Sequence, residues 1–106
     1  MAEPGVAAVV AARFGGDAAL YHAFAAACAE QFALDVVAGR AACAAGDLAV
    51  LRRLAHNLKS ALSLLGRDAA SSLAAQVEAQ AATGDADSAG LSWRALDTAL
   101  SAPGAP

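Results

Sequence analysis

The apolar positions between residues 47 and 66 predict one amphipathic helix. Five leucines repeat there at intervals of three and four, at Leu51, Leu54, Leu58, Leu62 and Leu65. That spacing places them on one stripe of an α-helix, which turns once every 3.6 residues. Gly46-Asp47 precedes the segment and Gly66 ends it, and glycine and aspartate are typical residues at helix ends. We therefore expect a helix over about 47–65 with its leucine stripe buried.

Weaker patterns predict helices along the rest of the chain. The expected segments are about 4–14, 17–30, a third segment that ends at 45, 68–83 and 89–102. We expect a break between Ala29 and Asp35, although no glycine or proline marks one. Long helices with short links favour an all-α fold, an antiparallel up-down four-helix bundle with a short extra N-terminal helix.

The flanking helices supply the other expected core positions, with Phe14 closing one end of the bundle. We place Trp93 at the edge of the bundle and treat Gly39 as a weak point in its helix. The expected core positions are Leu20, Phe24, Ala27, Cys28, Val36, Val37, Ala41, Cys43, Ala70, Leu73, Val77, Ala81, Leu91, Leu96 and Leu100.

Composition narrows the class of protein. The 106 residues fit a single domain (1–106), with a core over about 6–102 and a Pro/Gly tail over 103–106. The net charge of −3 argues against nucleic-acid binding. No apolar run reaches the roughly 20 residues of a membrane span, and the N-terminus does not resemble a signal peptide. We expect a cytoplasmic protein that contacts no membrane, with Cys28 and Cys43 as free thiols.

The polar face of the central helix carries the candidate chemistry. His56 lies roughly opposite the leucine stripe, with Arg52 and Arg53 one turn before it and Lys59 just after it. Exposed neutral imidazole is a nucleophile that can accept a phosphoryl group. A phosphoryl group carries about −1.5 to −2 charges, which a nearby cation stabilises. Two small residues, Ser60 and Ser63, leave the approach to His56 open.

Other interpretations of this face remain open at this point. It could be a solvated helix surface that happens to include a histidine. Metal binding has less support, because no histidine, cysteine or carboxylate lies three or four residues from His56. Serine hydrolase chemistry also lacks support, because no carboxylate in the local sequence completes a triad. The other histidine, His22, is interpreted as a solvated surface residue.

The segment from Ala55 to Ser60, which reads AHNLKS, resembles the signature of histidine phosphotransfer (HPt) domains. That family shows His-x-Leu-Lys-Gly, a small residue seven positions after the histidine, and Leu-Gly at the ninth and tenth positions. Ser63 and Leu65-Gly66 occupy the later positions. The frame around them is similar too, at Phe14-Gly15-Gly16-Asp17, Gly46-Asp47, Val77-Glu78 and Gly84-Asp85. The resemblance covers about residues 6–102. Ser60 replaces the usual glycine, and Leu64 stands where a polar residue is common, which suggests an apolar contact with a partner.

The resemblance implies a phosphorelay function. The outer ring nitrogen of His56 would take a phosphoryl group from a receiver-domain aspartate and pass it to another receiver, and Lys59 would stabilise its charge. The expected partners are response-regulator receivers or a hybrid sensor histidine kinase. The domain would bind no cofactor and have no ATP site, since the receiver supplies Mg²⁺. The implied docking residues are Arg52, Arg53, Ser60, Ser63, Leu64 and Arg67.

Three alternatives share the same helical shape. One is a receiver-binding domain that no longer transfers phosphate. Another is the phosphorylatable domain of a chemotaxis-type kinase, which takes phosphate from an ATP-binding domain. The third is an inert helical adaptor, for which a change at His56 would alter nothing.

Overall fold

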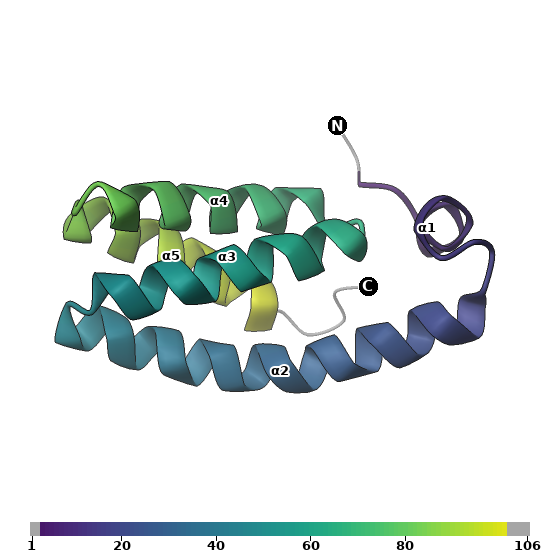
Figure 1. Cartoon of the computed structure of the whole chain (residues 1–106), viewed down its shortest axis with the longest axis horizontal. Coiled ribbons are helices and arrows are strands. Elements are labelled where there is room, and N and C mark those ends of the chain that lie inside the picture. Colours follow the sequence, from purple (N-terminus) through teal and green to yellow (C-terminus); the bar gives the residue numbers. More distant parts are fainter. Residues whose placement is uncertain (1–2, 102–106) are drawn as a thin grey trace.

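Five helices make up the part of the chain that the computed structural model describes, residues 3–101. They are α1 (Val6–Arg13), α2 (Ala18–Ala45), α3 (Leu48–Leu64), α4 (Asp68–Ala82) and α5 (Ala86–Ser101). Helices α2 to α5 form a bundle in which successive helices run in opposite directions. Helix α1 lies across the N-terminal end of α2 (Figure 1). The predicted all-α bundle with a short N-terminal helix is confirmed, and the predicted 103–106 tail lies outside the described residues.

Aspartate caps start three of the bundle helices. The side chains of Asp17, Asp47 and Asp85 each accept a hydrogen bond from the backbone N–H three residues later, at 3.0, 3.2 and 3.1 Å. Each bond satisfies a backbone donor that the first helical turn leaves unpaired. Short turns between these caps and the preceding helices are the local reason that the chain folds back on itself.

The α3–α4 turn is built on Gly66, which has a φ of +75° and lies against α1. A Cβ built at this position would overlap the Val9 side chain, so the turn has no room for a larger residue. Positive φ also disfavours any residue with a side chain. Gly66 therefore both reverses the chain after α3 and provides the surface on which α1 docks.

The leucine stripe of α3 forms the centre of the core, as predicted. Leu51, Leu58 and Leu62 are fully buried, while Leu54 and Leu65 are partly buried. Alanines on α4 and α5 face this stripe, and their small side chains let the helices approach closely. Five expected core positions are wrong, because the structure exposes Leu20, Ala27, Val37, Ala41 and Leu91 to solvent.

Helix α2 is continuous over 28 residues, so the predicted break between Ala29 and Asp35 is wrong. This stretch contains no glycine or proline, and alanine and leucine in it favour a helix. A hydrogen bond of 2.9 Å from Gln31 to the carboxylate of Asp35, one turn later, stabilises the same turn. Nothing local therefore stops the helix until Gly46.

Trp93 is buried rather than placed at the edge, with only 2% of its surface exposed. Its indole lies directly on the backbone of Gly39 in α2, where a Cβ would overlap the ring. Gly39 is thus the position where Trp93 of α5 packs against α2. This contact requires a residue without a side chain. Gly39, which was expected to be a weak point in its helix, is therefore a position where two helices pack.

Candidate functional site

His56 and Lys59 share one carboxylate supplied by a different helix. Nδ1 of His56 lies 2.7 Å from Oε2 of Glu78, and Nζ of Lys59 donates to Oε1 of Glu78 at 2.6 Å. His56 and Lys59 are one turn apart on α3, whereas Glu78 comes from α4. A further bond of 3.0 Å, from the Ser71 hydroxyl to the Lys59 carbonyl, joins the same two helices. The α3–α4 hairpin therefore sets the geometry of the site.

The carboxylate determines which nitrogen of His56 is available. The hydrogen bonds from Lys59 and then from His56 lower the pKa of Glu78 below its ordinary value. At neutral pH Glu78 is therefore ionised and can only accept hydrogen bonds. The proton of a neutral His56 then resides on Nδ1, which leaves a lone pair on Nε2. Because 62% of the side chain is exposed, a partner can reach that nitrogen.

Two basic side chains lie beside this nucleophile. Arg52 and Arg53 line a shallow surface depression together with Ala49, His56 and Glu78. Ser60, Ser63 and Leu64 continue the exposed face of α3 beyond the histidine, and 45% of the Leu64 surface is accessible. The face has positive charge on one side of His56 and small or apolar residues on the other. Such a surface can attract an anionic partner and admit it to the ring.

Comparison with known families identifies the family of the chain. A family model described as Hpt domain matches residues 19–102. The chain belongs to the Hpt domain family. Hpt domains are phosphocarrier modules that carry out histidine phosphotransfer in phosphorelays, and they interact with receiver domains. The match covers the bundle helices, while α1 precedes it. Searches among curated proteins and among solved structures returned no match to the chain.

Glu78 is the member of this candidate site that sequence reasoning missed. No carboxylate lies near His56 in the sequence. Sequence reasoning used Glu78 only as one of the positions outside the motif that resemble the family. The sequence feature that points to Glu78 is its distance from the turn of the α3–α4 hairpin. His56 precedes Gly66 by ten residues and Glu78 follows it by twelve. Residues at similar distances from an antiparallel turn lie side by side. A carboxylate at that distance could therefore have been paired with the histidine.

Arg67 is the predicted docking residue that the structure does not bring to His56. It lies in the α3–α4 turn, and its Nη2 donates to the Ala99 carbonyl of α5 at 2.9 Å. The residue is half-buried and lines a groove between α2 and α5. Arg67 therefore helps to hold the end of α5, and its role in docking stays a prediction.

No metal-binding cluster accompanies the site within residues 3–101. No group of three or more histidine, cysteine or carboxylate side chains is close enough there to hold an ion. The other histidine, His22, is exposed on α2, where its ring meets Tyr21 edge-on at 5.3 Å. Its predicted surface position is confirmed. None of the five helices, in the residues searched, is long and apolar enough to cross a membrane.

Proposed function

We propose that this Hpt domain accepts a phosphoryl group on Nε2 of His56 from the aspartyl phosphate of a receiver domain and passes it to the aspartate of another receiver. The observation that carries this proposal is the 2.7 Å contact between Nδ1 of His56 and Glu78. It assigns the proton to the inner nitrogen and the nucleophilic lone pair to the outer one. Receivers, the residues involved and the order of transfer all belong to the proposal.

The transfer step balances without a further reactant. The Nε2 lone pair attacks phosphorus, the bond from phosphorus to the aspartate oxygen breaks, and the receiver recovers a free carboxylate. The imidazole now bears hydrogen on Nδ1 and phosphorus on Nε2, so the ring is cationic. Glu78 is an anion already in contact with that ring and stabilises the charge as it develops. In the next step an aspartate attacks phosphorus, and neutral imidazole leaves.

Lys59 has a second task in this scheme. Its ammonium is bound to Glu78 before transfer, one turn from His56, which holds a positive charge beside the ring. A phosphoryl group on Nε2 brings negative charge to the same face. Lys59 then attracts it, and the two arginines, Arg52 and Arg53, add to the positive field.

The partner supplies what the domain lacks. Receiver pockets are acidic in this scheme and hold Mg²⁺, so Arg52 and Arg53 complement their charge during docking. Ser60, Ser63 and Leu64 would form the rest of the contact. The same domain can act as a free-standing protein or as part of a hybrid sensor kinase, and a cytoplasmic location stays a prediction.

A transfer assay tests the proposal. The domain is mixed with a phosphorylated receiver and Mg²⁺, and label on the domain is followed after acid and after base treatment. Label that is lost in acid and kept in base identifies a phosphohistidine. No label from any of several receivers, although they bind the domain, would contradict transfer and favour the receiver-binding alternative.

Glu78→Gln should slow phosphoryl transfer to His56 by about 10- to 100-fold, the range in which activity falls when a metal-binding histidine loses the partner that orients it. The amide can donate as well as accept, so it no longer holds the proton on Nδ1, and it carries no charge to offset the phosphorylated ring. The rate of label transfer measures the effect. Imidazole nitrogen NMR shifts should report less Nδ1–H tautomer in the same variant.

An unchanged rate in Glu78→Gln would contradict the positioning role of Glu78. The urea unfolding midpoint of the variant provides the control for folding. Glu78 is partly exposed and its bonds are partly solvated, so the midpoint should move little.

A further inference from the structure

Helix α2 presents a second apolar surface that neither the core nor the His56 site uses. Seven exposed residues recur on it at alternating intervals of three and four: Ala23, Ala26, Glu30, Ala33, Val37, Arg40 and Ala44. This interval is the heptad pattern of helices that pack against another helix. Two thirds of the Val37 surface is exposed, and the same is true of Leu34 beside it. We call these seven positions the α2 stripe.

We propose that the α2 stripe pairs with the α2 stripe of a second copy of this chain, in antiparallel orientation about a two-fold axis near residue 35. The order of residues supports this occupant. Glu30 and Arg40 lie five positions on either side of residue 35, and Ala33 and Val37 lie two positions on either side. An antiparallel pair centred there places Glu30 opposite Arg40 and Ala33 opposite Val37 of the other copy, as a two-fold interface requires.

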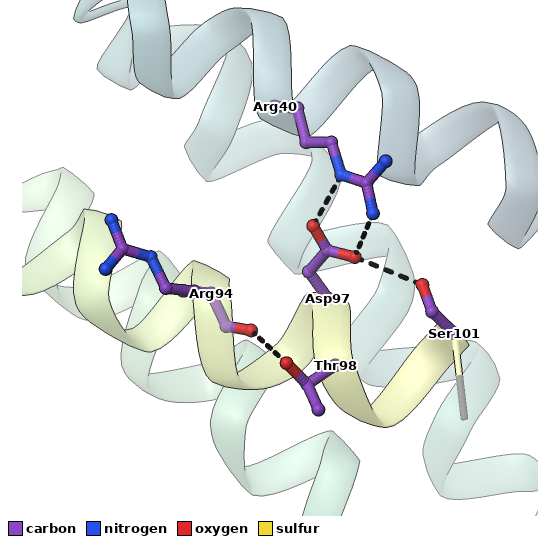
Figure 2. A network of polar contacts seen from close by, with 5 residues as sticks. All are labelled: Arg40, Arg94, Asp97, Thr98 and Ser101. Carbon is purple, nitrogen blue, oxygen red and sulfur yellow. Dashed lines mark hydrogen bonds and ion pairs between the residues drawn. The ribbon is translucent and has the colours of Figure 1, made fainter.

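Charge complementarity favours this register. The α2 stripe contains two charged residues, and they have opposite signs, so Glu30 of each copy meets Arg40 of the other. Arg40 bonds Asp97 through Nε at 2.7 Å and Nη2 at 2.9 Å, as Figure 2 shows. Within residues 3–101, Nη1 of Arg40 and the carboxylate of Glu30 make no side-chain hydrogen bond or ion pair. They can therefore meet across the axis, while a parallel pair in register would oppose like charges.

Shape supports the same arrangement. Four of the seven positions are alanine, which lets two helix backbones come close together. Beside the α2 stripe runs a groove of about 500 Å³, walled partly by Phe32, Val36, Leu65 and Leu100. A second copy would cover this apolar groove together with the stripe. Removing such surface from water is the driving force for association.

The proposed interface leaves the phosphotransfer face free. In the bundle α2 packs against α3 and α5, whereas His56 and Glu78 lie where α3 meets α4. Arg40 of the α2 stripe contacts Asp97 of α5. Figure 1 shows α2 as an outer element of the bundle, with the other helices on one side of it. A dimer would thus present two separate copies of His56, and the inference does not rest on the proposed function.

Two measurements on the intact chain test the dimer. Light scattering coupled to size exclusion should give the mass of two chains for the wild type and of one chain for Glu30→Arg, which sets two cations against each other. Leu34 lies beside the α2 stripe, one residue from the proposed axis, so Leu34→Cys should be joined to its own copy by a short bis-maleimide. Leu64→Cys, at an exposed leucine on α3, should not be joined to its own copy. The wild type is the control for reaction of the reagent with Cys28 and Cys43.

The outcomes separate clearly. A dimer that is lost in Glu30→Arg and captured in Leu34→Cys supports the proposal. A monomeric wild type, a dimer that persists in Glu30→Arg, or equal cross-linking of Leu34→Cys and Leu64→Cys would overturn it. Circular dichroism of Glu30→Arg should match the wild type, because Glu30 is exposed and makes no side-chain bond within the described chain.

Discussion

His56→Gln is expected to take no label from a phosphorylated receiver, whereas His22→Gln is expected to be labelled like the wild type. Glutamine has no ring nitrogen with a free lone pair, so the variant cannot form a phosphoramidate. His22 is exposed as well, but the described structure gives it no carboxylate partner to select its tautomer. The two variants remove the only histidines of the chain one at a time, and label transfer measures each.

Label on His56→Gln, or its loss in His22→Gln, would contradict the assignment of the acceptor. Folding is checked in both variants through the urea midpoint. His56 contributes an exposed contact with Glu78, and exposed pairs of this kind add little to the stability of a protein. A domain that keeps its midpoint and loses all label would therefore have lost chemistry rather than structure.

Gly39→Ala should lower the free energy of unfolding by about 1–3 kcal/mol, the usual cost of an added group in a packed core. The new methyl group would overlap the Trp93 indole, so α5 must shift away from α2. This loss should outweigh the gain of up to about 1 kcal/mol that alanine brings to a helix interior. Urea unfolding of the two proteins provides the comparison.

Gly90→Ala is the matched control for this experiment. Gly90 also lies inside a helix, but apart from its chain neighbours and the backbone of its own helix, no atom lies within 4 Å of the position that its Cβ would occupy. Here alanine should stabilise the fold by about 0.5–1 kcal/mol, because nothing opposes its helix propensity. If both substitutions stabilised the protein, the close contact between Gly39 and Trp93 would not exist in solution.

Local signals in the sequence were sufficient to predict α3 and its exposed histidine. A leucine stripe at helical spacing, an aspartate before it and a glycine after it act within a few residues of one another. They do not depend on which other helix packs nearby. The same local chemistry placed His56 and Lys59 one turn apart on the solvated face, and the motif around them suggested the family.

The sequence was less informative about α2. It is apolar on nearly all sides, so its hydrophobic pattern did not indicate which face the bundle buries. Leu20 and Val37 were therefore assigned to the core, and the structure exposes both. The predicted break failed for a related reason: the prediction assumed a shorter helix, although no residue there interrupts one.

Contacts between helices were decided only by the tertiary structure. The sequence alone determined that this protein is helical, where α3 begins and ends, and that His56 lies on a basic, exposed face. It did not determine that Glu78 contacts His56, that Trp93 packs against Gly39, or that Arg67 donates a hydrogen bond to α5. Those pairs are far apart in the chain, and they meet because the α3–α4 turn and core packing set the register between helices. Periodicity within one helix carries no information about that register.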